Sequence, residues 1–302
     1  MTGYRVIAPG HPEWVSGLHE MDSIGAPRRL FVTGSPIDPE VRRIAIVGTR
    51  RPTAAGVEAA QQFGAALASA GWCIVSGMAI GIDAAAHRAA LDAGGKAIAV
   101  VGCGLDVPYP VRNAGLHRRL RAAGTIVSEY EEGTQPLPHH FPARNRIIVG
   151  LSEAAVVIEG GVRSGALITA RLALDANREV FAVPGSFRNP MAVGPNGLIR
   201  ASQATPATQV EHILDVLSSD LQWDRSGPDI VVHLDEDEAA VLSLLDDSPI
   251  TPSYVARELQ QGNREVSLAL SSLEIRGFAV KKSSGYELTS SGAAARGARS
   301  IA

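Results

Sequence analysis

Residues 44–50 read IAIVGTR, an apolar run that ends in Gly48, Thr49 and Arg50 before a helical pattern begins near Ala54. A buried parallel strand that passes through glycine into a helix leaves unpaired backbone N–H groups and the positive end of the helix dipole facing outward. Such an end suits a bound phosphate. The stretch therefore predicts an α/β fold and an anion-binding edge of its sheet.

The same layout of strand, glycine and helix recurs along the chain. It is found at WCIVS before Gly77, at IAVV before Gly102 and at AVVI shortly before Gly160. Several glycine-lined crevices on one sheet edge indicate a groove for several phosphates. We therefore expect a phosphate-rich polymer or a nucleotide as the ligand.

From residue 43 onward, continuous apolar strands alternate with amphipathic helices. The pattern predicts strands at 43–47, 72–76, 97–101, 125–128, 154–158 and 180–183, and helices at 54–70, 82–93, 113–123, 144–151, 165–176 and 208–217. This alternation indicates a Rossmann-like, doubly wound and mostly parallel sheet. Ligands bind such sheets beyond the carboxyl ends of the strands.

Composition divides the chain into five segments. They are an extension at 1–41 that packs on the main domain, a Rossmann-like domain at 42–217, a linker at 218–234, a small domain at 235–290 and a disordered tail at 291–302. The extension contains one strand candidate at 29–33. The small domain is predicted to hold three helices and a two-stranded ribbon, the element order of a winged helix.

Charge is distributed unevenly along the 302 residues, whose net charge is −3. Residues 42–217 hold 17 Lys and Arg against 13 Asp and Glu, a net of +4, whereas residues 235–290 hold 5 against 10, a net of −5. Only the first segment has the balance expected of a surface that binds a polyanion.

Several classes of protein are excluded by composition. Only Cys73 and Cys103 are present, each beside a predicted strand, so we expect two buried thiols rather than a disulfide framework. No apolar run is long enough to span a bilayer and the N-terminus lacks a signal-peptide layout, so we expect a cytoplasmic protein. No zinc spacing, Walker loop or nucleophile elbow is present, and we predict no metal and no cofactor.

The motif SGMAIGIDAAAH at residues 76–87 is the strongest local signal. Gly77 and Gly81 allow close backbone approach beside Ser76, and the four-residue spacing places Asp83 and His87 on one helix face. We expect His87 to donate to a phosphate and Asp83 to accept backbone N–H groups of the loop. An Asp–His pair that only stabilises the helix is the alternative.

The motif FPARNRIIVG at residues 141–150 places two arginines at the opening of a helix. Arg144 and Arg146 flank Asn145 and point to opposite sides of the first turn, so we expect one to hold a phosphate while the other pairs internally. Phe141 offers a ring on which an unpaired base can stack.

The motif EGGVRSGALITA at residues 159–170 repeats the glycine-to-helix layout, with Ser164 and Gly165 at the helix mouth. A second interpretation of this motif stays open. A Glu beside paired glycines at a Rossmann strand end fits the general acid or base of a nucleoside-monophosphate glycosidase. That superfamily usually has PGGxGT at this place, which the residues after Glu159 do not match.

Together these motifs resemble the DprA/Smf family of bacterial DNA-processing proteins. IAIVGTRRPTAAG, IVSGMAIGIDAAAH, VVGCGLDVPYP, SEYEEGTQPLPHHFPARNRIIVGLS, SGALITARLAL and VFAVPG follow the family's order and spacing over about residues 43–199. The resemblance implies a non-enzymatic protein, often a homodimer, that binds and protects incoming single-stranded DNA. It also implies loading of the RecA recombinase onto that DNA during natural transformation.

Carried over by motif, the resemblance assigns nine residues to the DNA backbone. They are Arg50, Ser76, Gly77, Gly81, His87, Arg144, Arg146, Ser164 and Gly165. With five residues from the motifs themselves, Gly48, Thr49, Asp83, Phe141 and Asn145, they make up the predicted DNA site. Two functions compete with this one: the glycosidase using Glu159, and a nucleotide sensor in which the same crevices hold one small ligand.

Three features depart from the family pattern. Only about forty residues precede the first strand, so we expect a form without the additional N-terminal helical domain of many members. The segment after LI at 198–199 reads RASQ where members commonly have Gly-Ala. The predicted helix at 263–276 has Glu265 and Glu274 beside its two arginines, so we expect the small domain to bind protein, to pack on its own chain or to cap the groove rather than read DNA.

Overall fold

The computed structural model describes residues 3–21, 25–218, 234–246, 248–282 and 284–289. The chain forms two compact units, residues 1–220 and residues 221–302. Nearly all of the predicted linker at 218–234 and all of the predicted tail at 291–302 lie outside the described residues.

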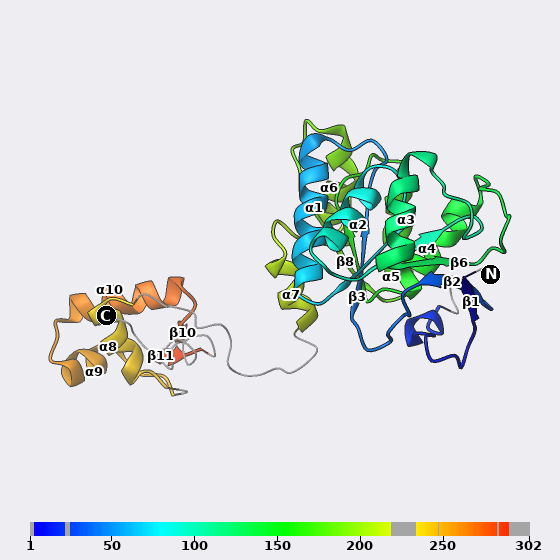
Figure 1. The fold of residues 1–302 in the computed structure, drawn as a ribbon. Helices are drawn as coiled ribbons and strands as arrows, with labels where there is room; N and C mark the ends of the chain where they lie inside the picture. Colours follow the sequence, from blue (N-terminus) through cyan, green and yellow to red (C-terminus); the bar gives the residue numbers. More distant parts are fainter. Residues whose placement is uncertain (1–2, 22–24, 219–233, 247, 283, 290–302) are drawn as a thin grey trace. The chain divides into compact units, whose positions relative to one another are not determined.

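The first unit is built on a nine-stranded sheet (Figure 1). Its strands are β1 (Tyr4–Ile7), β2 (Leu30–Gly34), β3 (Arg43–Val47), β4 (Cys73–Ser76), β5 (Ala97–Val101), β6 (Thr125–Ser128), β7 (Ala154–Val157), β8 (Glu179–Ala182) and β9 (Thr205–Pro206). They lie in the order β1-β2-β6-β5-β4-β3-β7-β8-β9. In this order, every neighbouring pair from β6 to β9 is parallel, whereas the pairs β1–β2 and β2–β6 are antiparallel. The predicted mostly parallel sheet is confirmed.

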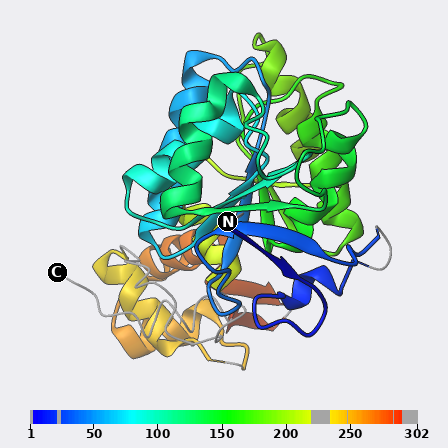
Figure 2. The same cartoon turned by 45° about the vertical axis from the view of Figure 1, so that its right-hand side comes forward.

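Helices cover both faces of the sheet (Figure 2). They are α1 (Ala54–Ser69), α2 (Ile82–Asp92), α3 (Ala114–Ala123), α4 (His140–Gly150), α5 (Gly165–Asp175), α6 (Val193–Arg200) and α7 (Glu211–Ser218), with 3-10 turns η1 (Ser16–Leu18), η2 (Val111–Asn113) and η3 (Pro190–Ala192). One core holds apolar residues of α1, α2, α3 and α7. The other holds those of α4 and α5 together with η1. The sheet is therefore doubly wound, as expected.

The N-terminal extension packs on the main domain and also adds two strands to its sheet. The strand predicted at 29–33 is β2, which pairs antiparallel with β6, and β1 adds one more strand outside it. The sequence prediction missed β1. Trp14 and Leu18 join the core on the α4 face, so this segment buries apolar area on the sheet that carries the main fold.

The segment GPNGLI at 194–199 forms most of α6. Two glycines and a proline give it a low helix propensity, which packing overrides. A Cβ on Gly194 would lie 2.4 Å from the carbonyl oxygen of Gly160. That glycine is therefore present for close approach to the loop after β7.

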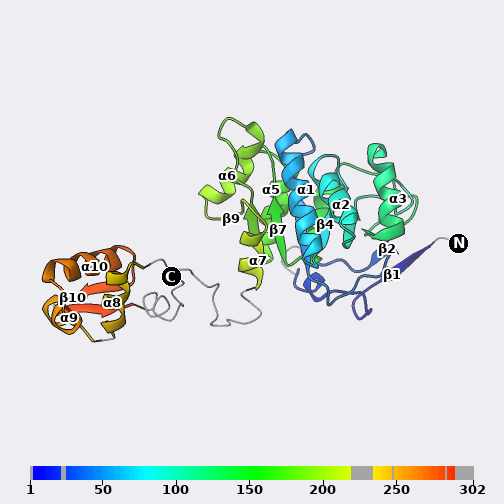
Figure 3. The ribbon, with the colours of Figure 1, turned by 60° about the vertical axis from the view of Figure 1, so that its left-hand side comes forward.

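The second unit contains three helices followed by an antiparallel ribbon, as predicted (Figure 3). Its elements are α8 (Glu236–Leu244), α9 (Pro252–Leu259), α10 (Asn263–Ile275), β10 (Ala279–Lys282) and β11 (Gly285–Leu288). Asp235 and Glu238 form a capping box at the start of α8. Val241, Val255 and Leu270 are completely or almost completely buried in a separate core.

Both cysteines are buried and free, as expected from the composition. Within the described ranges, no helix combines the length and the apolar character that a membrane crossing requires.

We expect Gly64→Ala to destabilise the first unit, because the new Cβ would lie 2.8 Å from the carbonyl oxygen of Ala86 where α1 packs on α2. Overpacking of this kind costs about 1–3 kcal/mol in the free energy of unfolding. Gly115→Ala, on an exposed part of α3, meets only the tip of Arg118 at 4.0 Å. It should stabilise by roughly 0.5–1 kcal/mol through helix propensity. Urea denaturation followed by circular dichroism measures both, and equal effects would contradict the close packing.

Candidate nucleic-acid interface

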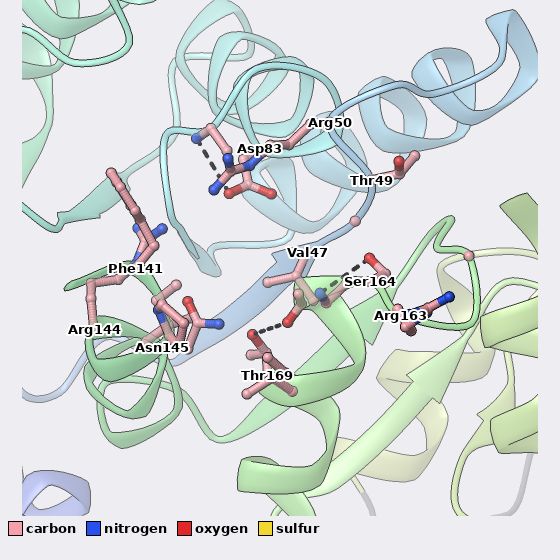
Figure 4. Close-up of a pocket in the computed structure, with 18 of the residues that line it drawn as sticks. Val47, Thr49, Arg50, Asp83, Phe141, Arg144, Asn145, Arg163, Ser164 and Thr169 are labelled. Atoms are coloured by element: carbon pink, nitrogen blue, oxygen red, sulfur yellow. Dashed lines mark hydrogen bonds between the residues drawn. The ribbon is translucent and has the colours of Figure 1, made fainter. Parts of the chain in front are cut away.

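A pocket of about 660 Å³ lies at the carboxyl ends of β3 and β7. These two strands are neighbours, yet the chain continues from β3 into α1 on one face and from β7 into α5 on the other. Strands that diverge in this way open a crevice at the topological switch point of the sheet. The loop at 48–50, the start of α4 and the start of α5 form its walls (Figure 4).

The structure brings nine of the predicted site residues together in this pocket. They are Gly48, Thr49, Arg50, Asp83, Phe141, Arg144, Asn145, Ser164 and Gly165. They come from four separate stretches of the sequence. The expectation that several glycine-lined loops meet at one sheet edge is confirmed.

Arg50 supplies an exposed positive charge at one wall. Its guanidinium carbon lies 5.5 Å from the ring centre of Phe141, and that ring lies 5.4 Å from the ring centre of Tyr109. Among the described residues, no carboxylate lies within 4 Å of Arg50. The wall thus combines an unneutralised cation with two aromatic rings.

The opposite wall is the N-terminal end of α5. Ser164 is the N-cap, and its hydroxyl accepts the N–H of Ala166 at 3.3 Å. The 11-residue helix that begins at Gly165 directs its positive dipole end and its first N–H groups at the pocket. Arg163 is exposed beside it and has no ion pair within the described part of the chain. Both walls therefore favour an anion.

Buried charges behind the pocket hold its loops. Asp83 accepts the N–H of Gly77 at 3.1 Å and that of Ala79 at 3.4 Å, which confirms its predicted role. Burial raises the pKa of Asp83, and the nearby charge of Arg144 together with these N–H groups opposes the rise. Burial also lowers the pKa of Arg144 to about 10, so its guanidinium stays charged at neutral pH.

Arg144 is only 5% exposed and donates to the carbonyl of Val100. It lies one turn inside α4, because that helix begins at His140 and not at residue 144 as predicted. Because Val100 belongs to β5, the guanidinium is held against the sheet and not at the exposed rim of the pocket. Asn145 lines the same wall, and its side-chain amide has no hydrogen-bond partner among the residues described.

The prediction that His87 donates to a phosphate is wrong. The side chain is 0% exposed and neither ring nitrogen has a hydrogen-bond partner in the described structure. Burial lowers the pKa of His87 to about 3, against the opposing influence of the Ser76 backbone. Asp83 and His87 do share a face of α2, as the spacing indicated, but that face packs inward. The alternative Asp–His pair is not formed either, since Asp83 binds the loop.

Four further predicted residues do not line the pocket, and each has an internal contact instead. The Ser76 hydroxyl donates to the carbonyl of Ile46 at 2.6 Å. Gly81 has a φ of +90°, and a Cβ there would lie 2.4 Å from the carbonyl oxygen of Thr49. Ser76 and Gly81 therefore shape the loops without reaching the ligand space.

Gly77 borders a smaller cavity of about 80 Å³ that shares Arg50, Phe141 and Arg144 with the pocket, and a Cβ there would collide with the guanidinium of Arg144. Arg146 places one terminal nitrogen 2.7 Å from both carboxylate oxygens of Glu129. The expectation that only one of the two FPARNR arginines pairs internally is therefore wrong, because both do.

Arg163, Tyr109 and Thr169 line the pocket although none was among the predicted site residues. The motif around Arg163 was noted for its glycine-to-helix layout and for its mismatch with PGGxGT, and Arg163 itself was given no role. An arginine directly before an N-cap serine at a strand end was the available signal. Tyr109 carried no signal, because the loop that brings it to Phe141 is long.

Glu159 is buried, and its carboxylate is hydrogen-bonded to other residues of the chain. Its carboxylate accepts the N–H and the hydroxyl of Thr53 at 2.9 and 2.7 Å, and the side-chain amide of Asn189 at 2.9 Å. It does not line the pocket. This carboxylate ties the start of α1 to the loop after β8. In the residues described, no three His, Cys, Asp or Glu side chains are arranged to hold a metal ion.

We expect the buried His87 to make stability depend on pH. The unfolded chain takes up a proton near the ordinary pKa of 6.5, whereas the folded chain does so only near 3. Stability from this group is complete above pH 6.5 and is lost as the pH falls, by about 1.4 kcal/mol per pH unit. His87→Gln should flatten the slope of unfolding free energy by that amount between pH 5.5 and 4, where the unfolded histidine is protonated and the folded one is not. The exposed His139→Gln is the control, and an unchanged slope in His87→Gln would contradict the burial.

Comparison with known proteins agrees with this geometry. Residues 5–218 match the model of the family described as DNA recombination-mediator protein A. The chain is 38% identical to Protein Smf of Escherichia coli over 86% of this chain and 71% of the relative. It is 41% identical to DNA processing protein DprA of Bacillus subtilis over 63% of each.

Two solved structures share the fold at sequence identities of 39% and 28%. DNA processing protein A of Streptococcus pneumoniae superposes with a TM-score of 0.67 and 39% identity, over 71% of this chain and 74% of that one. The second is DNA processing protein A of Helicobacter pylori, whose structure was determined for its single-stranded DNA binding mode. It superposes with a TM-score of 0.65 and 28% identity, over 72% of this chain and 96% of that one. With a family match across the whole sheet, the chain belongs to the DNA recombination-mediator protein A family, the DprA/Smf proteins.

Proposed function

We propose that this protein binds single-stranded DNA in the pocket between β3 and β7 and delivers it to the RecA recombinase. The observation that carries the proposal is the pair of exposed arginines that line the pocket without carboxylate partners in the described structure, Arg50 on one wall and Arg163 beside the N-terminus of α5 on the other. The family to which the chain belongs, and the DNA binding of its H. pylori relative, support the same ligand.

The geometry suits a strand held by its backbone. Guanidinium groups on both walls and the first N–H groups of α5 are donors for phosphate oxygens. Phe141 and Tyr109 offer ring faces to unpaired bases, which stack with little regard to sequence. We therefore expect affinity that is nearly independent of sequence and falls steeply with salt.

Arg50→Ala and Arg163→Ala should each weaken binding of an oligothymidylate about tenfold, since each removes a charge-assisted contact to phosphate. Each should also lower the slope of log K against log salt by about 0.7. Fluorescence anisotropy across a salt series measures both quantities.

Arg118→Ala is the matched control, because Arg118 is exposed on α3 and lines none of the pockets in the described structure. If both pocket variants bind DNA with wild-type affinity and a wild-type salt slope, the assignment of the pocket as the DNA site is wrong.

Glu159 argues against the glycosidase. A general acid or base must reach the reacting bond, but this carboxylate is saturated by Thr53 and Asn189 and lies outside the pocket lining. We propose a non-enzymatic protein.

Incubation with nucleoside monophosphates should release no free base, as followed by chromatography. Calorimetry with mononucleotides should give far weaker binding than with oligothymidylate. Released base would favour the enzyme, and tight mononucleotide binding would favour the nucleotide sensor.

RecA loading, protection of incoming DNA, a homodimeric state and a cytoplasmic location complete the proposal. They rest on the resemblance to the family and not on a contact in this chain. Light scattering tests the dimer, and nuclease digestion of the bound strand tests protection. Displacement of a single-strand-binding protein by RecA, with and without this protein, tests the loading.

We further propose that residues 235–290 form a winged helix that does not read DNA bases. The order of α8, α9, α10 and the β10–β11 ribbon supports the fold. The exposed face of α10 carries Glu265 and the apolar Leu268, 64% exposed, beside Arg264. A helix that reads the major groove presents several basic and amide side chains instead.

A further inference from the structure

Phe187 is the most exposed large apolar side chain in the described part of the chain, at 86%. It lies at the tip of the loop between β8 and η3, followed by the exposed Arg188. The guanidinium carbon of Arg188 lies 5.7 Å from the Phe187 ring centre. No ion pair within the described ranges involves Arg188. A bare aromatic ring with an unneutralised cation above it has no role in the fold.

Hydrogen bonds hold the loop that carries Phe187, so the exposed ring has a defined position. The side-chain amide of Asn196 donates to the carbonyl of Gly185 at 2.8 Å, and its oxygen accepts the Gly185 N–H at 3.1 Å. On the other side of the tip, the N–H of Asn189 donates to the carbonyl of Ser186 at 2.9 Å, and that of Arg188 to the Ser186 hydroxyl at 3.3 Å.

The same loop forms part of the pocket rim. Asn189 donates to Glu159, and the N–H of Gly160 donates to the carbonyl of Met191 at 2.6 Å. Met191 itself lines the pocket. Figure 3 places the loop that leads into α6 at the same end of the unit as the start of α1. A Cβ on Gly161 would lie 3.5 Å from the terminal methyl of Met191, so the segment that follows the Phe187 loop packs against residues 159–161, shortly before Arg163 in the sequence.

A polymer that enters a pocket must also leave it. Val162, 73% exposed, precedes Arg163, and the loop that carries Phe187 and Arg188 is hydrogen-bonded to residues 159 and 160. Exposed apolar side chains and guanidinium groups therefore occur together on the two segments at this side of the pocket. An unpaired nucleotide has the matching groups, an apolar base face and a phosphate. A single ring between Pro184 and Arg188 is too small an apolar area for a protein partner.

We propose that Phe187 and Arg188 form a second subsite for single-stranded DNA, in which the base of a nucleotide leaving the pocket past Arg163 stacks on Phe187. Arg188 binds the phosphate of that nucleotide. This inference rests on the proposed function and extends the DNA site beyond the pocket.

The test uses the full chain, oligothymidylate and a salt series. Phe187→Ala weakens binding about tenfold, because stacking of one base is lost, and leaves the salt slope unchanged. Phe187→Tyr retains wild-type affinity, because it keeps a ring. Arg188→Ala lowers the slope by about 0.7. The control is Tyr254→Ala, which removes another exposed aromatic ring beneath an arginine, Arg257 at 5.2 Å, and leaves binding unchanged.

The outcomes separate this inference from the proposed function. If Arg50→Ala weakens binding and Phe187→Ala does not, the subsite is wrong and the pocket stands. If the wild-type protein does not bind the oligomer, both the proposed function and the subsite are wrong. A Phe187→Tyr variant as weak as Phe187→Ala overturns stacking. A change in oligomeric state with unchanged DNA affinity assigns the ring to a contact between copies and overturns the subsite as well.

Discussion

The adjacency of β3 and β7 is the constraint on which the site depends. The two strands share parallel hydrogen bonds, and immediately beyond them the N–H of Thr49 still donates to the carbonyl of Glu159 at 2.7 Å. From that point the chain must diverge, because α1 lies on one face of the sheet and α5 on the other. The space between the diverging chains is the pocket, and Arg50 and Arg163, which follow β3 and β7, take their positions from this split.

Charges around the split serve two separate purposes. Asp83, Arg144 and Glu159 are buried; Asp83 and Glu159 accept hydrogen bonds from loop residues, and Arg144 donates to the carbonyl of Val100 in β5. Burying them without partners would cost several kcal/mol each, so they hold the loops in one arrangement. Arg50 and Arg163 remain exposed at the rim. A ligand with phosphate groups thus meets the exposed pair, and the buried groups keep that pair in place.

The motifs located the site better than they assigned its side chains. Nine of the fourteen predicted residues line one pocket, because glycine-to-helix turns after parallel strands must collect at one edge. His87 and Arg146 were misplaced for a different reason. Spacing along a helix indicates which residues share a face, but whether that face points to solvent or to a neighbouring strand depends on contacts far away in the sequence. Arg163 was missed because its role comes from its place beside α5.

The alternation of apolar strands and amphipathic helices, the two-unit division and the glycine-rich sheet edge were all determined by the sequence, since local periodicity and turn residues encode them directly. Tertiary structure alone decided the addition of β1 and β2 to the sheet, the helical state of residues 193–200 and the inward direction of His87 and Arg144. Each of these depends on pairing or packing with residues distant in the chain, as Gly194 does against Gly160, and no local pattern carries that information.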